Sequence, residues 1–504
     1  MLARTISCRS EGLETDPVTV EAEILSGFTQ FTIVGLAGAS IQEAKERIRA
    51  ALHAMNLRMP LGRIIVNLYP GDLKKGGTQW DLAIAVALCG AMQRVPVAPL
   101  KHKAFIGALA LDGHCRPVPG AYAMVHRLAE AGFSDVYLPC DNVDECRTIQ
   151  GVRLYPCHQL AEVLHDLDGT RAITPVIGHA EAPCATRPPV GDYAELQHAE
   201  ILKRVLTIAV AGRHHLLLIG PPGMGKSMAL SRLPSVLPML SAEADQEIRA
   251  FESVAQCGER PFGHMPFRPV SLPITAAALL GGGVPIYPGE ITLAHRGVLV
   301  MDELPLFPTA LLNQLRLPLE HQRISLSRGG RHLNVPADFQ LMATANPCPC
   351  GYAGDSRHTC TCKAYQIQKY RQHIPAPVMD RIDLIVTLND EDHGGSSQKP
   401  LNSFQMRLAI AKAMERQWER NGPGRYNARV TDDVTPKALG CASESQTLLS
   451  DVSTHFALSR RAARRILLVA RTIADVDGEE MIQPNAILEA FQYRRAMGEW
   501  TQTS

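Results

Sequence analysis

One short motif constrains the fold of this chain more than any other feature of its sequence. The motif G-x-x-x-x-G-K-S runs from Gly220 to Ser227, with the apolar segment HHLLLI before it and a helical pattern after it. Glycines in such a turn let backbone N–H groups converge on phosphate oxygens, and the helix that follows presents its positive end to them. In this setting Lys226 reaches the β- and γ-phosphates of a nucleotide, and the Ser227 hydroxyl holds Mg²⁺. The residues expected to bind the phosphates of ATP are Gly220, Pro221, Pro222, Gly223, Met224, Gly225, Lys226 and Ser227.

A second apolar segment, GVLVM, ends in the acid pair Asp302 and Glu303. A buried strand of this kind carries its acids at its carboxyl end, where open α/β sheets bind their ligands. An apolar run followed by two acids is common and, on its own, indicates little. Downstream of a phosphate loop it indicates the strand that supplies acids to the nucleotide site. We expect Asp302 to join Ser227 in the shell of the Mg²⁺ ion, and Glu303 to orient and deprotonate the attacking water.

The patterns along the chain predict an α/β protein of several parts. Residues 1–167 mix strand patterns, such as the alternating VTVEAEI, with helical ones and predict an α+β domain. Residues 168–191 are rich in Pro, Ala and Gly without periodicity, which is typical of a linker. Strands and helices alternate over residues 192–398, so we expect a parallel sheet there. Residues 399–504 show an almost entirely helical pattern.

Composition excludes several classes of protein. Lys and Arg number 51 against 50 for Asp and Glu, a net charge of +1, so the chain is not a globally basic nucleic-acid coat, although a local basic groove remains compatible with that sum. The sequence contains no apolar run of the roughly 18 residues that a membrane span needs. The start, MLARTISCRSEGLE, lacks the apolar core of a secretory signal. We therefore expect a cytoplasmic protein without a membrane partner.

Four of the thirteen cysteines gather in one short stretch. Two close pairs joined by a loop can place four thiolates tetrahedrally around Zn²⁺, which makes a structural Zn²⁺ the favoured interpretation. The single-residue spacing within each pair is tighter than usual, so free thiols and an iron–sulfur or redox role stay open. The candidate ligands are Cys348, Cys350, Cys360 and Cys362.

Together these features resemble the ComM/YifB family of magnesium-chelatase-like AAA+ ATPases over nearly the whole length of the chain. The segments that support this resemblance are VGLAGASIQEAKERIRAAL, GPPGMGKS, PFRP with AALLGGG, PGEITLAHRGVLVMDELPLF, ATANPCPCGY, VMDRIDL and ALSRRAARRILLVARTIADVDG. The resemblance implies a Lon-protease-like first domain and a AAA+ core followed by a C-terminal helical lid. Within the core it implies a helix-2 insert over 262–283 and a pre-sensor-1 hairpin over 320–335.

The resemblance also implies three catalytic side chains beyond the phosphate loop. Asn346 matches the sensor-1 residue, which contacts the γ-phosphate or the lytic water. Arg381 matches the arginine that related rings supply to the neighbouring subunit's nucleotide, and Arg461 matches the sensor-2 arginine of the lid. The competing interpretation for both arginines is a solvated helix charge, and Arg461 has close rivals in Arg460, Arg464 and Arg465. An arginine that acts on a neighbour requires an oligomer, so the analogy predicts a hexameric ring.

The segment IxLxRGGRxLxV alternates on both sides of its glycine pair and predicts a hairpin in its own right. In relatives this hairpin points into the pore of the ring, where Arg323, Arg328 and Arg331 would meet the phosphates of a DNA strand. Simple solvation of these arginines is an equally good interpretation.

The chain departs from the family pattern at two places. Ser271 and Leu272 stand where the family usually has a pair of histidines. Gln79 stands where Lon-type proteases carry their nucleophilic serine, so we predict no peptidase activity.

Two functions follow as hypotheses. The first is an ATP-driven motor on branched or single-stranded DNA, a helicase or branch-migration enzyme of recombination in natural transformation, with recombination proteins as further partners. The alternative is a magnesium-chelatase-like ATPase that remodels a protein and has no DNA role.

Overall fold

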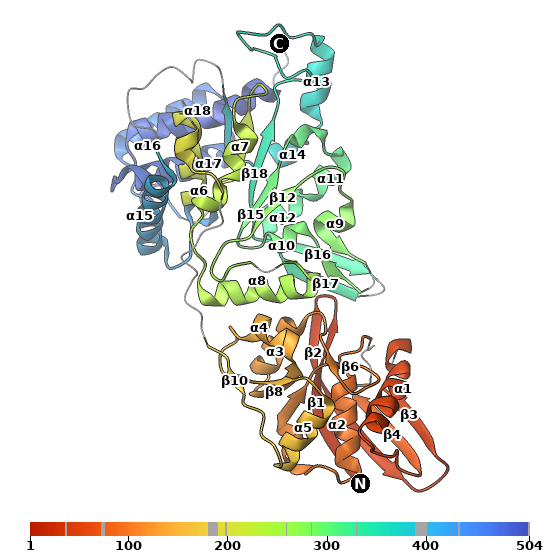
Figure 1. Ribbon diagram of the computed structural model, residues 1–504. Helices are drawn as coiled ribbons and strands as arrows, with labels where there is room; N and C mark the ends of the chain where they lie inside the picture. The colour runs from red at the N-terminus through yellow and green to blue at the C-terminus, as the bar shows by residue number, and fades with distance from the viewer. Residues whose placement is uncertain are drawn as a thin grey trace.

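The chain folds into two bodies that meet along one helix near the middle of the molecule (Figure 1). The computed structural model describes residues 1–35, 38–71, 76–179, 190–196, 199–258, 260–283, 285–328, 331–388, 401–431 and 434–501. The first body holds the N-terminal residues, and the second holds a parallel sheet and the C-terminal helices.

The first body is built on two long strands, β1 (Leu2–Glu11) and β2 (Glu14–Leu25), which pair antiparallel along their whole length. The alternation of VTVEAEI matches the burial of β2, where side chains of one face enter the core. Helix α2 (Asp81–Ala91) is buried throughout because its residues are almost all apolar, and it packs against both strands. The other elements here are β3 (Gln30–Val34), α1 (Ala39–Ala54), β4 (Arg63–Tyr69), β5 (Lys103–Phe105), β6 (Ala108–Leu109), β7 (Cys115–Arg116), α3 (Ala121–Glu130), β8 (Asp135–Pro139), α4 (Val143–Cys146), β9 (Arg153–Cys157), α5 (Leu160–Asp168) and β10 (Val176–Ile177).

The main sheet of this body has the strand order β10-β9-β8-β5-β1-β2-β4-β3. Its edge strand β10 lies inside the segment predicted as a linker, so that prediction is wrong for these residues. Val176 pairs with Leu154 and Ile177 with Arg153. Two paired residues show no periodicity that a sequence pattern could detect, which is why the strand was missed.

The second body is built on a five-stranded parallel sheet with the order β12-β15-β18-β11-β19. Its strands are β11 (Leu216–Ile219), β12 (Phe267–Val270), β15 (Val298–Met301), β18 (Gln340–Ala345) and β19 (Leu384–Thr387). β11, β15 and β18 are buried on both faces and therefore consist almost wholly of apolar residues. Because the strands are parallel, the segments that follow β11, β15 and β18 all emerge at one edge of the sheet.

Several short elements connect these strands. The bounds are α6 (Glu200–Gly212), α7 (Lys226–Ser231), α8 (Ala242–Ala255), α9 (Ala276–Leu280), β13 (Gly281–Gly282), β14 (Tyr287–Pro288), α10 (Glu290–Leu293), α11 (Thr309–Gln314), α12 (Arg316–His321), β16 (Arg323–Arg328), β17 (Arg331–Pro336), α13 (Ala364–Gln372) and α14 (Ala376–Met379). The insert predicted over 262–283 begins too early, because β12 inside it pairs with β15 as part of the central sheet. That strand is short, half-buried and contains Pro269, so it lacks a clear strand pattern.

The predicted hairpin is present as the antiparallel pair β16 and β17, in register from Arg323 opposite Pro336 to Arg328 opposite Arg331. Its glycine turn, residues 329–330, lies outside the described residues. The predicted range also took in Glu320, which belongs to α12 and not to the hairpin.

The C-terminal part is helical, as its pattern indicated. It contains α15 (Ser403–Asn421), α16 (Ser443–His455), α17 (Arg460–Asp477) and α18 (Pro484–Thr501). These helices share one hydrophobic core with α6 and one face of the central sheet. They therefore form a single folded unit with the sheet.

The two bodies join through α8, which lies across the top of the N-terminal body in Figure 1. Its Ser253 hydroxyl donates to Glu145 at 3.0 Å, and its Gln246 amide donates to the carbonyl of Thr148 at 3.3 Å. At the turn between β1 and β2, the N–H of Leu13 donates to the carbonyl of Ile286 at 2.9 Å. The junction thus combines polar contacts from a helix with a backbone bond beside the insert.

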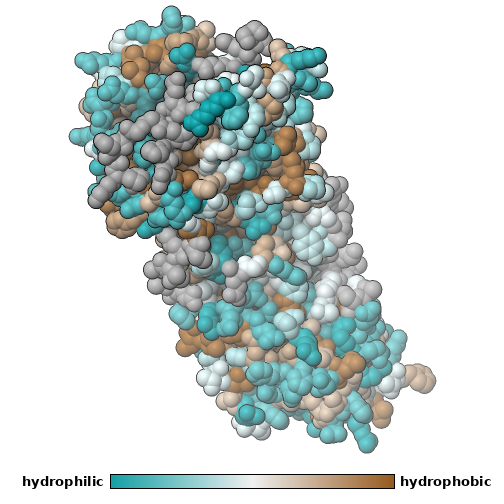
Figure 2. Space-filling view, turned by 45° about the horizontal axis from the view of Figure 1, so that its top comes forward, coloured by the Kyte–Doolittle hydropathy of each residue, from teal (hydrophilic) through white to brown (hydrophobic). Residues whose placement is uncertain are grey.

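On the face shown in Figure 2, hydrophilic residues predominate and hydrophobic ones form small separate patches. Among the helices of the described ranges, none combines the length and apolar character needed to cross a membrane.

Candidate active site

The phosphate loop connects β11 to α7, at the carboxyl edge of the central sheet. Gly223 and Gly225 have φ values of +88° and +73°, a backbone conformation that residues other than glycine rarely adopt. Gly225 also precedes the first residue of α7, Lys226. The two glycines thus turn the chain so that the loop leads directly into the start of the helix.

Lys226 is buried and its ammonium group lies inside the loop. Nζ donates to the carbonyl oxygens of Gly220 at 2.5 Å and Pro221 at 2.7 Å, and to Oδ1 of Asn346 at 3.3 Å. Burial lowers the pKa of Lys226 to about 8, although the nearby carboxylates of Asp302 and Glu303 act in the opposite direction. The sequence-predicted lysine and sensor residue are therefore in direct contact.

Ser227 and Asp302, which the sequence predicts to share the shell of a Mg²⁺ ion, are also in contact. The Ser227 hydroxyl donates to the two carboxylate oxygens of Asp302, at 3.1 and 2.8 Å. A hydroxyl and a carboxylate so close together offer the hard oxygen ligands that Mg²⁺ prefers, usually along with waters and substrate phosphates. The pair therefore fits a Mg²⁺ ion bound beside a triphosphate.

Glu303 and Asn346 lie at the same edge. Nδ2 of Asn346 donates to Oε1 of Glu303 at 3.4 Å. Glu303 has a φ of +53°, an uncommon backbone conformation for a residue with a side chain, and such residues cluster at functional sites. The contact places the candidate base beside the amide of Asn346, at the edge of the sheet that carries the phosphate loop.

One residue of this cluster escaped the sequence analysis. The buried hydroxyl of Thr344 donates to Asp302 and accepts from the backbone N–H of Glu303 at 2.9 Å. Thr344 lies near the end of β18, two residues before Asn346, which follows the strand directly. A polar residue at this spacing inside the apolar run LMATAN was the signal available in the sequence.

The two predicted arginines lie away from this cluster. Arg381 follows α14, is only 5% exposed, and donates to the carbonyl of Pro377 at 2.6 Å and to Glu320. Arg461, on α17, donates to the other oxygen of Glu320 at 3.4 Å. The structure therefore brings Arg381 and Arg461 together through a glutamate that the sequence analysis did not assign.

These two arginines line a pocket of about 960 Å³ at the amino ends of β11 and β19. The backbone N–H of His215 there donates to Asp383 at 3.0 Å, and Arg465 pairs with the same carboxylate at 3.2 Å. Burial alone would raise the pKa of Asp383, but Arg465 and His214 hold it well below its usual value. His215 immediately precedes β11 and Gly220 immediately follows it, so the length of that strand separates this pocket from the phosphate loop of the same chain. The other side chains of the pocket include Gln322, Arg429, Arg460 and Arg464.

The hairpin arginines are placed only in part. Arg323 is exposed at the start of β16. Arg328 and Arg331 form the last backbone pair of the hairpin, and their side chains lie outside the described part of the chain.

The two departures from the family pattern lie elsewhere in the fold. Ser271 and Leu272 follow β12 directly. Gln79 is buried in the first body, and its amide donates to the carbonyl of Gly76 at 3.1 Å.

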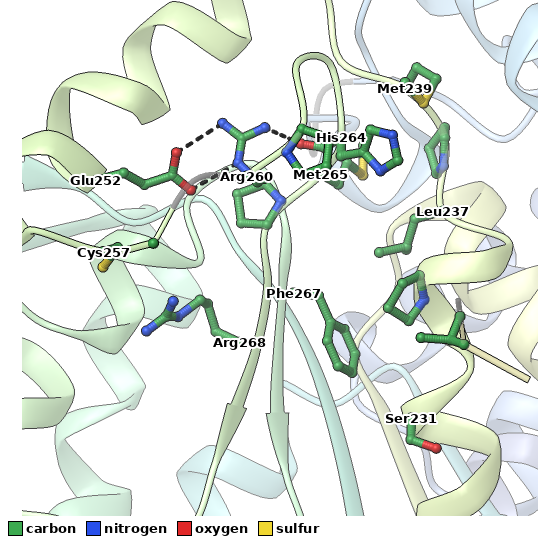
Figure 3. Close-up of a pocket in the computed structure, with 16 residues that line it drawn as sticks. Ser231, Leu237, Met239, Glu252, Cys257, Arg260, His264, Met265, Phe267 and Arg268 are labelled. Atoms are coloured by element: carbon green, nitrogen blue, oxygen red, sulfur yellow. Dashed lines mark hydrogen bonds and ion pairs between the residues drawn. The ribbon is translucent and has the colours of Figure 1, made fainter. Parts of the chain in front are cut away.

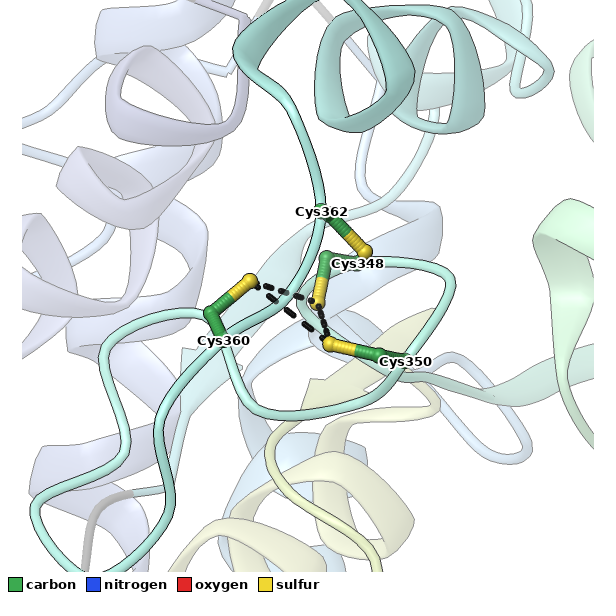
Figure 4. Close-up of side chains that lie close together, drawn as sticks. All are labelled: Cys348, Cys350, Cys360 and Cys362. Carbon is green, nitrogen blue, oxygen red and sulfur yellow. Dashed lines mark hydrogen bonds between the residues drawn. The ribbon is translucent and has the colours of Figure 1, made fainter.

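The four clustered cysteines come together in a loop after β18 (Figure 4). Their Sγ atoms all lie within 4.8 Å of one another, with Cys348 at 3.3 Å from Cys350 and 3.7 Å from Cys360. Four sulfurs around a tetrahedral Zn²⁺ would lie about 3.8 Å apart, given a Zn–S distance of about 2.3 Å. Backbone N–H groups of Tyr352 and Thr361 donate to Cys350 and lower its pKa to about 5. The donor set and its spacing fit Zn²⁺.

This cysteine loop packs against the phosphate loop. At Gly351, which has a φ of +91°, a Cβ would lie 2.8 Å from Cδ of Pro222 and 2.9 Å from its Cγ. On the other side, Nε of Arg371 donates to the carbonyl of Pro347 at 3.3 Å. The position of the loop is therefore set by the ATP site on one side and by α13 on the other.

A further pocket of about 340 Å³ lies between α8 and the segment that leads into β12 (Figure 3). Arg260 crosses one side of it, held by Glu252 at 2.8 Å and by the carbonyl of His264. Its lining is mainly apolar, with Leu237, Met265 and Phe267 among its residues. The phosphate-loop residues 220–227 do not line this pocket, so it is separate from the candidate site.

Family models for magnesium chelatase match the chain in three places. "Magnesium chelatase, subunit ChlI" matches residues 192–395, and "Subunit ChlI of Mg-chelatase" matches residues 20–142. "Magnesium chelatase, subunit ChlI C-terminal" matches residues 401–494. The first of these covers the phosphate loop, the acid pair and the cysteine cluster.

Similar proteins cover nearly the whole chain. Protein YifB of Salmonella typhimurium is 35% identical over 489 residues, which is 96% of this chain and 95% of the relative. Competence protein ComM of Haemophilus influenzae is 34% identical over 505 residues, covering 98% and 97% of the two chains. An MCM-type protein of Methanocaldococcus jannaschii is 26% identical over 185 residues, only 37% of this chain and 21% of that protein.

The family models and the full-length relatives agree with the geometry of the phosphate loop and its acid pair. This family implies ATP and Mg²⁺ as ligands and an ATPase activity. The chain belongs to the ComM/YifB family of magnesium-chelatase-like AAA+ ATPases.

Proposed function

We propose that this protein is an ATP-hydrolysing motor that works as a hexameric ring on branched or single-stranded DNA in the cytoplasm. Helicase or branch-migration activity in recombination of the natural-transformation type is the function that we assign to it, with recombination proteins as partners. The observation that supports ATP hydrolysis is the contact of Lys226 with Asn346, next to the pair of Ser227 and Asp302. The name of the relative ComM and the hairpin with Arg323 at its base support the DNA part.

The residues at the carboxyl edge of the sheet divide the work of hydrolysis. Lys226 and the N–H groups of the loop bind the β- and γ-phosphates, and Ser227 with Asp302 holds Mg²⁺. The metal ion neutralises charge on the phosphate oxygens when it is bound. Glu303 takes a proton from the attacking water, and Asn346 holds its carboxylate in line. Thr344 fixes both acids, since its hydroxyl contacts the side chain of one and the backbone of the other.

Arg381 and Arg461 act on the nucleotide of the neighbouring subunit in this proposal. They lie together at the end of the sheet opposite their own phosphate loop, in a pocket rich in arginine. A closed ring brings such a face to the phosphate edge of the next copy. An arginine supplied across the interface neutralises the charge that develops on the transferred phosphoryl group.

We further propose that Cys348, Cys350, Cys360 and Cys362 bind a structural Zn²⁺. Their facing sulfurs and the backbone N–H donors at Cys350 support this assignment over free thiols or a redox role. The metal would fix the loop against Pro222 and thereby support the ATP site. The test is the metal content of the purified protein together with its count of reactive thiols. A protein without metal, in which all four thiols react freely, contradicts the assignment.

The decisive experiment is steady-state ATP hydrolysis by the purified protein. It is measured without DNA, with duplex, with single strands and with a four-way junction, at low and moderate salt, with Lys226→Ala as the inactive control. We expect stimulation by single strands or the junction that fades as salt rises, because phosphate contacts release counterions. Glu303→Gln should still bind ATP and hydrolyse it slowly.

A rate that no DNA changes would instead favour a protein-remodelling ATPase. The family models, which all describe a magnesium chelatase subunit, support that second function. The predicted absence of peptidase activity is checked in the same preparation with an unfolded protein as substrate.

A further inference from the structure

A single carboxylate ties the entrance of the hairpin to both candidate arginines. Glu320 lies near the end of α12, and Gln322, with a φ of +56°, turns the chain into the first residue of β16. The carboxylate of Glu320 accepts hydrogen bonds from Arg381 and, at 3.4 Å, from Arg461. A displacement of the hairpin base therefore acts on both arginines through one side chain.

The exit of the hairpin is attached to the same pocket. Asp338, just after β17, accepts a hydrogen bond from Arg429 at 2.9 Å, and Arg429 lines the pocket that holds Arg381 and Arg461. The N–H of Ala337 donates to the carbonyl of Gln322 at 2.7 Å and closes the base. Both ends of the hairpin are thus anchored to arginines around one cavity.

In this arrangement both terminal nitrogens of Arg381 already donate a hydrogen bond. One terminal nitrogen donates to Pro377 and the other to Glu320, while Nε is buried without a hydrogen-bond partner among the described residues. Carboxylates and phosphates bind the same fork of guanidinium donors, so they compete for it. A phosphate can therefore bind the guanidinium fork of Arg381 in a bidentate manner only after the contact with Glu320 opens.

The two contacts of Glu320 differ in how far they are open to solvent. The side chain of Glu320 is 32% exposed and that of Arg461 is 50% exposed, so solvent screens part of their attraction. The side chain of Arg381 is only 5% exposed, so a movement of the end of α12 exchanges the contact with Arg461 more readily than the contact with Arg381.

We propose that Glu320 is a positioning residue that withholds Arg381 and Arg461 from the neighbouring subunit's nucleotide until the hairpin is displaced. The inference rests on the proposed function, because it requires ATP hydrolysis in a ring with arginines acting across the interface. A strand of DNA that engages the hairpin moves the end of α12 and opens the pair. The two arginines then bind the phosphates of the next subunit, and DNA binding and turnover are linked through α12.

The test compares wild-type protein with Glu320→Gln, which keeps the size of the side chain and removes its charge. Turnover is measured without DNA and with single-stranded DNA over a range of ATP concentrations. We expect kcat without DNA to rise several-fold with little change in KM for ATP. The ratio of kcat with DNA to kcat without DNA should fall toward one. Glu320→Asp keeps the charge on a shorter side chain, so its kcat without DNA should lie between those of wild-type protein and Glu320→Gln.

Glu247→Gln serves as the matched control. Its carboxylate is 36% exposed, accepts a hydrogen bond from Arg296 at 2.7 Å, and lies in the same body away from the pocket. It should leave both the basal rate and the stimulation unchanged. The double variant Glu320→Gln with Arg381→Ala should lose the gain in basal rate, because that gain acts through Arg381.

Two results overturn the proposal. One is a basal rate that is unchanged or lower in Glu320→Gln, which would make the glutamate a simple structural support. The other is a gain that survives the loss of Arg381. If wild-type protein ignores DNA, the proposed DNA function fails, while the basal rates of the single and double variants still decide the role of Glu320.

Discussion

Gly351 of the cysteine loop lies directly against the ring of Pro222 in the phosphate loop, with no room between them for a side chain. Two segments more than a hundred residues apart are therefore packed as one surface next to the ATP site. This contact joins the cysteine loop to the phosphate loop. Adding a single methyl group at Gly351 tests whether it affects nucleotide binding.

Gly351→Ala should weaken ATP binding and lower thermal stability. The new Cβ would meet Pro222 at 2.8 Å and would also sit at a φ of +91°. Gly354→Ala is the control, because that residue has a similar φ of +81° and nothing within 4 Å of its Cβ. Backbone strain alone costs roughly 1–3 kcal/mol at such positions. We expect both variants to lose stability, and only Gly351→Ala to raise the dissociation constant for ATP. Equal affinities in the two variants would mean that the packing has no effect on the site.

The affinity for ATP should fall as pH rises above about 8. Burial lowers the pKa of Lys226 from its usual 10.5 to about 8, so the free protein loses this positive charge within an accessible range. Bound phosphates favour the charged form, and above pH 8 each unit therefore weakens binding by up to about tenfold. Titration calorimetry between pH 7 and 9.5 measures this slope. In Lys226→Ala the slope should be absent.

The same shift has a defined effect on stability. The pKa of Lys226 is lower in the folded state than in the unfolded one, so burial of the charged lysine opposes folding below pH 8. That cost diminishes as pH rises from about 8 toward 10.5, the window between the two pKa values.

Thr344→Val should lower kcat far more than it changes KM. The substitution leaves the N–H of Glu303 without its acceptor and leaves Asp302 with Ser227 as its remaining donor, so both acids are held less firmly. We expect a loss of about 10- to 100-fold in turnover, in the range seen for residues that orient metal ligands. Thr292→Val is the control, since that threonine is also fully buried and its hydroxyl has no hydrogen-bond partner among the described residues. If both variants lose turnover equally, loss of a buried hydroxyl in general explains the effect.

Mixed rings should reveal whether Arg381 acts across the subunit interface. Arg381→Ala and Lys226→Ala subunits should each be inactive alone. In an equal mixture that assembles at random, about a quarter of all interfaces pair an intact phosphate loop with an intact arginine. ATPase activity near that fraction of the wild-type value is the expected result. A mixture that stays inactive, in rings shown by mass spectrometry to contain both subunits, would falsify the trans assignment.

Arg323→Ala should weaken binding of single-stranded DNA evenly across sequences. Loss of one phosphate contact lowers the slope of log affinity against log salt by about 0.7 for single strands. Fluorescence anisotropy at several salt concentrations measures both quantities. Arg49→Ala, an exposed arginine on α1 that pairs with Glu46, should change neither. An unchanged slope for Arg323→Ala would place the DNA path elsewhere.

Much of the phosphate site could be predicted from sequence because the residues that form it belong to short stretches with recognisable patterns. A strand, a glycine turn and a helix follow one another along the chain, and parallel strands place Asp302 and Asn346 at the same edge. The cysteine cluster was also visible, since its four members fall within one loop. In both cases short stretches of sequence determine which side chains meet.

Other features depend on contacts that no short stretch reveals. Glu320 meets Arg381 and Arg461 across separations of 61 and 141 residues, and nothing in its own neighbourhood marks it. Strands β10 and β12 are too short to show a sequence pattern. They form because β9 and β15 offer backbone hydrogen bonds with which they pair. The contact between Gly351 and Pro222 arises from the packing of two loops. Each of these depends on the assembled tertiary structure.

The bond between Leu13 and Ile286 ties the turn of the β1–β2 ribbon to the second body. β1 and β2 run as one stiff ribbon about 30–40 Å long from that bond to the far side of the first body. A rotation of this ribbon about that bond would move its opposite end further than the end held at Ile286. A ligand that bound the far end and restricted that rotation would also restrict the segment around Ile286, and the coupling free energy would be the same in both directions.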